Sequence, residues 1–217
     1  MVNRLAAEGY LKTPAYLAAF RAVQRSDFLP DGMQLEAGIN APLPIGGQQT
    51  ISQPLTVAFM LELLAPEPGH RVLDVGTGSG WTTALLAHVV GKSGHVYGIE
   101  RMPELCAFGR RNVAPYQFPN ITLVCGDGSL GLPEHAPFDR IQVAAAAQEV
   151  PQPLLDQLAA GGRMVIPTQQ DDLRLVARVS ASKYKTKIYP GFLFVPLIEG
   201  EKQEAGSMEQ GKIGREK

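Results

Sequence analysis

The chain has 217 residues, 45% of them hydrophobic, and a formal net charge of −1; this suits one domain with an ordinary core. The near-neutral charge argues against a dedicated nucleic-acid-binding protein, because such proteins neutralise phosphates with lysine and arginine. We also expect no membrane span, which needs ~18 apolar residues in a row, and no signal peptide, because Glu8 and Lys12 interrupt the apolar N-terminus.

Two helices are predicted in the first third of the chain. Residues 14–23 place apolar side chains at helical spacing after Pro14, and proline is favourable at a first helical position. Residues 26–47 are rich in Pro, Gly, Asp and Asn and are predicted to form a loop. Residues 55–66 then carry a second helical pattern, which Pro66 ends.

Strands and helices alternate from Arg71 onward. The predicted strands cover residues 71–76, 95–100, 121–127, 138–147 and 163–168. The predicted helices between them cover residues 81–90, 103–113 and 152–159, the first ended by Gly91 and the last by Gly161 and Gly162. This alternation predicts a doubly wound, mainly parallel α/β sheet.

The end of the chain has a different pattern. Residues 173–180 alternate apolar and polar, and residues 184–189 and 192–198 follow without a helix between them. We therefore predict an antiparallel addition at one edge of the sheet. From Glu199 to the end, residues 199–217 are almost free of apolar side chains and are predicted to be a disordered tail.

The cysteines and histidines give no sign of a metal site. Cys106 and Cys125 are not part of a CxxC or Cys/His cluster, and the four histidines are scattered. We expect the two cysteines to be separate, small buried hydrophobes, as in a protein of the reducing cytoplasm.

A glycine-rich turn is the first candidate binding site. The sequence "VLDVGTGSGW" puts Gly76, Gly78 and Gly80 between a predicted strand and a predicted helix, where glycines allow a ligand close to the backbone. Glu100 stands twenty residues beyond Gly80, at the end of the next strand, where an acid can accept hydrogen bonds from ribose hydroxyls. The spacing indicates a nucleoside site, although a glycine turn that only packs strand against helix remains an alternative.

The residues around this turn disfavour a dinucleotide. The GxGxxG pattern of dinucleotide folds wants glycine where Trp81 stands. A free carboxylate on Asp74 would repel pyrophosphate and favour a cation. S-adenosyl-L-methionine carries an ammonium and a sulfonium, so the charge argument favours it as the cofactor.

Asp127 and Gly128 follow the third predicted strand. The Asp127 carboxylate could accept a hydrogen bond from the adenine amine. The alternative is that Asp127 only forms a turn before Gly128.

Several segments in the same order resemble the protein-L-isoaspartate O-methyltransferases, from about residue 4 to about 198. The most specific segment comes first. The segments are "PLPIGGQQTISQP", "LDVGTGSGW", "GDG", "AAAAQEVPQPLLDQLAAGGRMVIP" and "FVPL".

The resemblance implies a fold and an activity. The fold would be the Rossmann-like S-adenosylmethionine-dependent methyltransferase fold with an N-terminal helical extension and an antiparallel C-terminal edge. A single domain, 1–198, would comprise N-terminal helices and substrate loop (1–66) and a cofactor-binding sheet (67–198). The enzyme would methylate the α-carboxylate of L-isoaspartyl residues in damaged proteins and peptides, and the ester would collapse to a succinimide. We expect a cytoplasmic monomer that binds neither nucleic acid nor membranes.

The resemblance also implies the site residues. Ser52 and Thr50 would be catalytic. The cofactor would be bound by Asp74, Gly76, Thr77, Gly78, Gly80, Glu100, Arg101, Asp127 and Gly128. The substrate would contact Ile45, Gln49, Thr50, Ser52 and Val195, and no metal is expected. Gly47, Gln48, Leu55 and Gln148 depart from residues frequent in the family, and they concern the shape of the pocket.

The uncharged segment around Ser52 suits this reaction. A carboxylate has a pKa of about 4, so it is already ionised at neutral pH and needs alignment more than a general base. A contacting cation would stabilise the anion before it loses its charge to the sulfonium, whereas neutral donors orient it with less of that penalty. We therefore expect Ser52 to orient the substrate; the alternative is that it caps the following helix.

Other functions remain open from the residues alone. A methyltransferase of this fold could act on a small molecule or RNA, although the sequence has no (N/D)PP(Y/F) segment or basic patch. A non-catalytic isoaspartate-binding module is a second alternative, and both Thr50 and Ser52 argue against it. An NAD-dependent oxidoreductase is disfavoured by Trp81.

Overall fold

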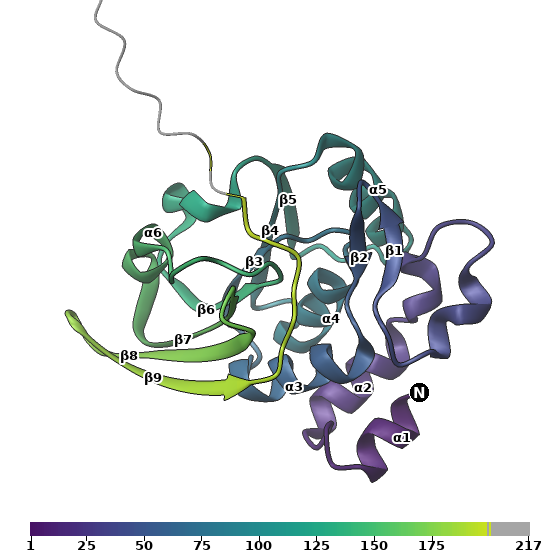
Figure 1. Cartoon of the computed structure of the whole chain (residues 1–217), viewed down its shortest axis with the longest axis horizontal. Helices are drawn as coiled ribbons and strands as arrows, with labels where there is room; N and C mark the ends of the chain where they lie inside the picture. Colours follow the sequence, from purple (N-terminus) through teal and green to yellow (C-terminus); the bar gives the residue numbers. More distant parts are fainter. Residues whose placement is uncertain (199, 201–217) are drawn as a thin grey trace, which may run out of the picture.

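A seven-stranded sheet forms the centre of the computed structural model, which describes residues 1–198 and Gly200 (Figure 1). The strand order is β5-β4-β3-β6-β7-β8-β9, and neighbours from β5 to β7 are parallel. The chain starts in the middle of the sheet and moves outward in both directions, which confirms the predicted doubly wound arrangement. The strands are β3 (Arg71–Val75), β4 (His95–Glu100), β5 (Ile121–Cys125), β6 (Phe138–Val143), β7 (Leu158–Thr168), β8 (Asp172–Ser180) and β9 (Lys183–Pro190).

The C-terminal edge is antiparallel, as predicted, but only two strands form it. β8 pairs with β7 and β9 pairs with β8. The prediction that residues 192–198 continue this edge is wrong. Ala146 N–H donates to the Val195 carbonyl (2.7 Å) and Leu197 N–H donates to the Ala146 carbonyl (2.8 Å). Residues 192–198, called the crossover segment below, therefore leave the edge and return across the sheet to the end of β6 (Figure 1).

Helices cover both faces of the sheet because successive strand residues point to opposite sides. In β3, Val72 belongs to a hydrophobic cluster that includes side chains of α2 to α5, whereas Leu73 belongs to a second cluster that includes α6. The α-helices are α1 (Val2–Ala7), α2 (Pro14–Ala22), α3 (Pro54–Leu64), α4 (Trp81–Val90), α5 (Pro103–Val113) and α6 (Gln152–Asp156). The 3₁₀-helices are η1 (Arg25–Phe28), η2 (Gln34–Gly38), η3 (Ala114–Tyr116), η4 (Gly128–Leu130) and η5 (Pro133–His135).

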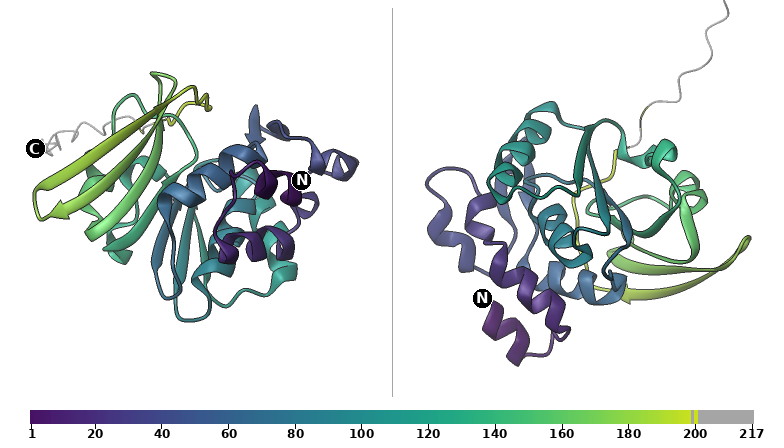
Figure 2. Two further views of the ribbon diagram at one scale, coloured as in Figure 1. Left: turned by 90° about the horizontal axis from the view of Figure 1, so that it is seen from below. Right: turned by 180° about the vertical axis from the view of Figure 1, so that it is seen from behind.

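The N-terminal extension packs against the helices on the sheet face to which Val72 points. Seen from behind, α2 lies beside α4, and α1 packs against α2 (Figure 2). Phe20 of α2 meets Trp81 of α4 edge to face, with ring centroids 5.5 Å apart. The helices predicted over residues 14–23 and 55–66 are present as α2 and α3, and Gly91 ends α4 as expected, with a positive φ of 64°.

The segment before α3 contains a hairpin that the sequence analysis treats as loop. β1 (Leu43–Gly46) and β2 (Gln49–Ile51) are antiparallel. Gly47 and Gln48 both have positive φ (56° and 58°), which a two-residue type I′ turn requires. Glutamine is an unusual residue for this turn, so the sequence carries little hairpin signal.

The predicted helix over residues 152–159 is too long. α6 ends at Asp156, and β7 already begins at Leu158 and continues through Gly161 and Gly162. A side chain at position 162 would lie 2.8 Å from the Ala159 carbonyl oxygen. These glycines therefore permit an irregular strand start, where β7 shifts register against β6, instead of ending a helix.

The prediction of two separate cysteines is wrong. Cys106 of α5 and Cys125 at the end of β5 form a disulfide, 19 residues apart in sequence. α5 packs against β5, and this packing brings the two thiols within bonding distance. No sequence motif connects the two cysteines. The cysteines therefore no longer support a reducing compartment.

The rest of the chain lies outside the described residues, so the predicted disordered tail is not tested. Over the part that the structure describes, no helix is long and apolar enough to cross a membrane.

Candidate functional site

A cavity of about 560 Å³ lies at the carboxyl ends of β3, β4 and β6. The β1–β2 hairpin, the start of α5 and the crossover segment complete its walls. This is the position where parallel α/β sheets bind ligands, because several loops converge there. The predicted site residues that line the cavity are Ile45, Gln49, Thr50, Ser52, Gly76, Thr77, Gly78, Glu100, Arg101, Gly128 and Val195.

Glu100 connects the glycine turn to the next strand. Its carboxylate, 7% exposed, accepts hydrogen bonds from the Gly78 N–H (2.9 Å) and from the Met102 N–H (3.0 Å), one on each oxygen. Each carboxylate oxygen can accept a further bond, so two acceptor positions remain for a ligand in the cavity. This geometry fits the predicted contact with two ribose hydroxyls.

Asp74 is not the free carboxylate that the sequence suggested. It is fully buried in β3, lies outside the cavity lining and accepts a hydrogen bond from Thr83 Oγ1 (2.6 Å). Burial, reinforced by the charge of Glu100, raises the pKa of Asp74 to about 7. The argument that Asp74 repels pyrophosphate is therefore wrong, because this side chain is covered by the fold.

Gly80 also lies outside the cavity lining, and its role is to let two helices approach. Its φ is 87°, and a Cβ there would lie 2.9 Å from Val113 Cγ2 and 3.1 Å from the Gly109 carbonyl oxygen. The third glycine of the turn therefore allows α4 to begin against α5. Of the three predicted glycines, Gly76 and Gly78 face the cavity.

Asp127 acts as a helix cap in this structure. Its Oδ1 accepts hydrogen bonds from the Ser129 N–H (2.9 Å) and hydroxyl (2.7 Å), and its Oδ2 accepts one from the Gly200 N–H (2.7 Å). Partial burial opposes ionisation, but these bonds outweigh it and lower the pKa of Asp127. The side chain does not line the cavity, so the turn-forming alternative describes its contacts here.

Thr50 and Ser52 reach the cavity from the end of the hairpin. Thr50 lies in β2 opposite Pro44, and Ser52 follows the strand directly. Ser52 does not cap α3, because the N-cap residue is Gln53 and makes no side-chain cap bond. The Ser52 side chain is half-buried and forms no hydrogen bond with another described residue, so its hydroxyl is available to a ligand.

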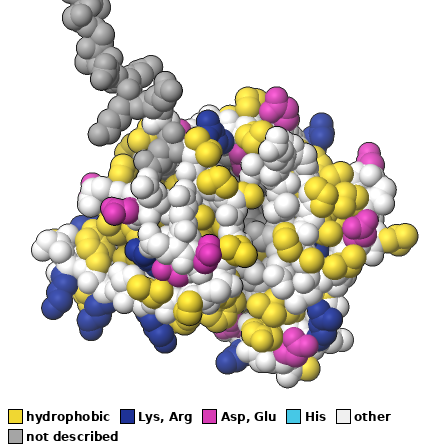
Figure 3. Space-filling view, viewed as in Figure 1, with side chains coloured by type: hydrophobic (Ala, Val, Ile, Leu, Met, Phe, Trp, Pro, Cys, Tyr) yellow, Lys and Arg dark blue, Asp and Glu magenta, His cyan; other side chains and the backbone are white. Residues whose placement is uncertain are grey.

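The charges around the cavity are few. Its lining includes the acids Glu100 and Glu104 and the cation Arg101. Lys and Arg side chains instead gather along the rim of the molecule formed by β8 and β9 (Figure 3). The hairpin wall is uncharged, as expected from its sequence.

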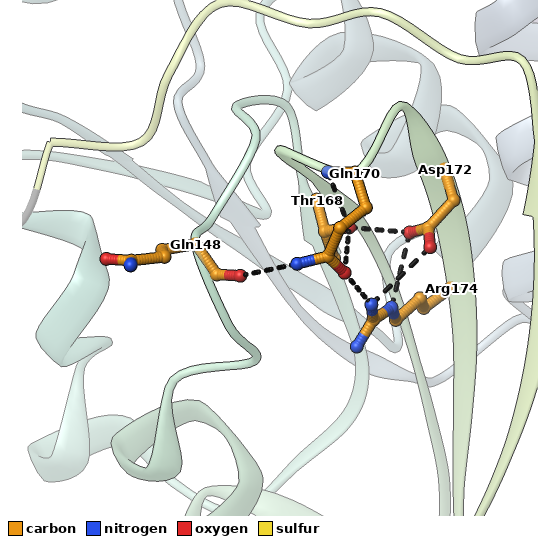
Figure 4. A network of polar contacts seen from close by, with 5 residues as sticks. All are labelled: Gln148, Thr168, Gln170, Asp172 and Arg174. Carbon is orange, nitrogen blue, oxygen red and sulfur yellow. Dashed lines mark hydrogen bonds and ion pairs between the residues drawn. The ribbon is translucent and has the colours of Figure 1, made fainter.

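A polar network fixes the far wall. The Thr168 hydroxyl donates to Asp172 (2.7 Å), and Arg174 Nε lies 3.2 Å from the same carboxylate oxygen (Figure 4). Gln170 reaches across to the Gln148 carbonyl (3.4 Å), while the Gln148 side chain points away from the network (Figure 4). The network therefore contacts the segment that follows β6. Ala146 in this segment forms the backbone hydrogen bond to Val195.

The sequence analysis did not assign several lining residues. Met102 is the N-cap residue of α5, Leu105 lies in its first turn, and residues 196–198 come from the crossover segment. Their positions next to Glu100 and Val195 in sequence were the available signal. A second hollow of about 1040 Å³ opens beside the cavity and shares Ile45, Gly47, Met102, Glu104 and Leu105 with it. Within the described residues, no group of His, Cys, Asp and Glu is arranged to hold a metal.

Comparisons with known proteins agree with this geometry. A family model described as "Protein-L-isoaspartate(D-aspartate) O-methyltransferase (PCMT)" matches residues 1–202. The chain is 42% identical to the protein-L-isoaspartate O-methyltransferase of Methanothermobacter thermautotrophicus over 202 residues, covering 91% of this chain and 93% of that one. It is 45% identical to the enzyme of the same name from Aeropyrum pernix over 202 residues, covering 91% of this chain and 78% of that one.

Solved structures extend the similarity to the fold. A Plasmodium falciparum protein described as a protein-L-isoaspartate O-methyltransferase, in complex with S-adenosyl-L-homocysteine, superposes with a TM-score of 0.82. The two are 25% identical, and the match covers 92% of this chain and 97% of the other. The predicted Rossmann-like methyltransferase fold is confirmed.

Proposed function

Because this chain belongs to the protein-L-isoaspartate(D-aspartate) O-methyltransferase family, we propose that it methylates the α-carboxylate of L-isoaspartyl residues in damaged proteins and peptides. S-adenosyl-L-methionine is the methyl donor, and its sulfonium supplies the methyl group. The resulting ester collapses to a succinimide, whose hydrolysis returns normal aspartate. The chain is then a protein-repair enzyme.

One observation carries this proposal. One cavity contains both the glycine turn with Glu100 and the hydroxyl groups of Thr50 and Ser52. The first pair suits a nucleoside, and the neutral hydroxyl groups suit a substrate carboxylate. The volume of about 560 Å³ is within the range of small-molecule sites. The adjoining hollow of about 1040 Å³ offers space for the polypeptide on either side of the reacting residue.

The cofactor residues follow from their contacts. Glu100 has one acceptor position left on each oxygen and is assigned to the ribose hydroxyls. Gly76, Thr77, Gly78, Arg101 and Gly128 line the same part of the cavity and are assigned to the remainder of the cofactor. Asp127 Oδ2 holds one donor, the Gly200 N–H, and keeps a second acceptor position, which we assign to the adenine amine.

Ser52 and Thr50 are assigned to the substrate carboxylate, with Ile45, Gln49 and Val195 around the peptide. Neutral hydroxyl groups orient an anion without holding its charge as strongly as a cation would. This matters because the carboxylate loses its charge as the carbon–oxygen bond forms. Ser52 accordingly orients the nucleophile and is not itself methylated or acylated.

Paired peptides test the activity. The protein is incubated with radiolabelled S-adenosyl-L-methionine and two peptides that differ only in carrying aspartate or isoaspartate at one position. Base-labile label on the isoaspartyl peptide alone is expected. If neither peptide is labelled while calorimetry shows that the protein binds S-adenosylhomocysteine, the proposed substrate is contradicted and another methyl acceptor is favoured.

Ser52→Ala tests the orienting role. We expect kcat/KM for the isoaspartyl peptide to fall roughly 10- to 100-fold, because the nucleophile loses its alignment. The dissociation constant of S-adenosylhomocysteine should stay unchanged, and the unfolding free energy should change by less than about 0.5 kcal/mol. Ser93→Ala is the matched control, since Ser93 does not line the cavity. Wild-type turnover in Ser52→Ala would remove Ser52 from the mechanism.

Location and oligomeric state complete the proposal. We assign the enzyme to the cytoplasm because its methyl donor is a metabolite of the cell interior, and we expect a monomer. Light scattering coupled to gel filtration measures the molar mass, and a mass well above 23.4 kDa would contradict the monomer.

A further inference from the structure

Arg25 is a buried cation without an acidic partner. It lies at the start of η1 and is 2% exposed. None of the ion pairs between described residues includes it. Burial lowers the pKa of Arg25 to about 10, so the guanidinium still carries its charge at neutral pH. A buried charge costs free energy unless polar groups surround it, and its contacts therefore call for an explanation.

All hydrogen bonds of the guanidinium go to backbone carbonyls around the candidate site. Nη1 donates to the carbonyls of Ala37 (3.2 Å) and Ile39 (2.9 Å). Nη2 donates to the carbonyls of Ala41 (2.8 Å) and Ser52 (3.2 Å). One rigid planar group thus joins the loop that leads into the hairpin to the residue that leaves it.

The same guanidinium lies over the indole of Trp81, 5.6 Å from the ring centroid. Trp81 is the first residue of α4, directly after the glycine turn, and it lines the cavity. Arg25 therefore contacts both halves of the site: the backbone of Ser52 on the hairpin side and the start of α4 on the cofactor side. Arg25 itself lines neither the cavity nor the neighbouring hollow.

We propose that Arg25 is a positioning residue for methyl transfer, which fixes the backbone of Ser52 against α4 from behind the cavity wall. The proposal rests on the proposed function. It reconciles a cation next to Ser52 with an uncharged cradle, because the charge acts on the Ser52 carbonyl while the hydroxyl faces the cavity. A lysine cannot replace Arg25, since one ammonium has three donors and cannot reach the four carbonyls that the planar guanidinium bonds.

The first test compares two buried arginines. Arg140 is 8% exposed and also bonds backbone carbonyls, those of Ala65 (2.9 Å) and Asp139 (2.8 Å), but it lies outside the cavity lining. In Arg25→Lys we expect kcat/KM for the isoaspartyl peptide to fall roughly 10- to 100-fold while S-adenosylhomocysteine affinity changes less than about threefold. Arg140→Lys should lose stability but keep wild-type kcat/KM. Equal kinetic losses in the two variants would overturn the proposal.

The second test asks whether Arg25 acts through Ser52. If it does, the double variant with Ser52→Ala and Arg25→Lys should lose little more activity than Ser52→Ala alone, within about threefold. Losses that multiply would show that Arg25 acts independently of Ser52 and would overturn the proposal. Should Arg25→Lys fail to fold, Arg25→Gln, which removes the buried charge and keeps amide donors, takes its place in both tests. A wild-type protein inactive on the peptide would refute the proposed function instead, and this outcome is seen before any variant is made.

Discussion

Asp74 and Glu100 are carboxylates on neighbouring strands, yet the structure places them in different surroundings. Glu100 stands at the cavity wall and accepts hydrogen bonds from two backbone N–H groups. Asp74 is sealed inside with one hydroxyl partner, and its Oδ1 has none among the described residues. The spacing from the glycine turn predicted the position of Glu100 correctly. Nothing in the sequence shows that Asp74 is covered, because its burial depends on strands and helices that are distant in the chain.

Asp74 should make stability depend on pH. Its pKa is raised from 3.8 unfolded to about 7 folded, so the folded protein binds more protons between these values and loses stability as pH rises from about 4 to about 7. The shift corresponds to at most about 4 kcal/mol. Asp74→Asn stays neutral, so its unfolding free energy should fall less over this range, measured by urea unfolding without cofactor. Identical pH profiles for both proteins would show that Asp74 does not titrate in this way.

Two helices and two other elements show how much of the structure the pattern along the chain predicts. α4 and α5 were predicted with correct bounds because their apolar spacing and their proline and glycine ends agree. The β1–β2 hairpin and the path of the crossover segment were not. The hairpin depends on a turn with positive φ at Gly47 and Gln48, for which glutamine is an unusual residue, and the crossover depends on backbone bonds to the distant Ala146. These two elements form the substrate side of the cavity.

The Cys106–Cys125 disulfide should stabilise the side of the cavity formed by the start of α5. It links the start of α5, which contributes Glu104 and Leu105 to the cavity, to the end of β5. A closed loop of this size is worth about 3 kcal/mol in the chain-entropy model. A phosphine reductant should therefore lower the thermal midpoint of the wild type and leave that of Cys106→Ser unchanged. A wild type that does not respond, with free thiols verified by mass spectrometry, would show that the bond contributes little.

The whole molecule forms its site between three sequence regions. The N-terminal segment supplies the hairpin and Arg25, the central sheet supplies the glycine turn and Glu100, and the C-terminal segment supplies Val195. Cofactor binding should also be linked to global stability, because the glycine turn, Glu100 and Gly128 come together in one cavity only in the folded state.

S-adenosylhomocysteine at a hundred times its dissociation constant should add about 2.7 kcal/mol of stability. For a chain of this size the thermal midpoint would rise by roughly 5–11 °C. NAD is the matched control, since the turn carries Trp81 where a dinucleotide site wants glycine. Thermal scans against ligand concentration measure both, and an equal or larger shift with NAD would contradict the assignment of the cofactor.

The sequence by itself determined the order of strands and helices from β3 to β9, the mainly parallel sheet, the family and the cavity side chains near the glycine turn and Ser52. These depend on short-range signals: residue periodicity, glycine and proline positions, and motif spacing. Only the tertiary structure decided that Asp74 is buried, that two cysteines meet and that Arg25 bonds the Ser52 carbonyl. Each of these is a contact between residues distant in the chain, and whether a polar group meets water, a carbonyl or another side chain is fixed only when the layers pack.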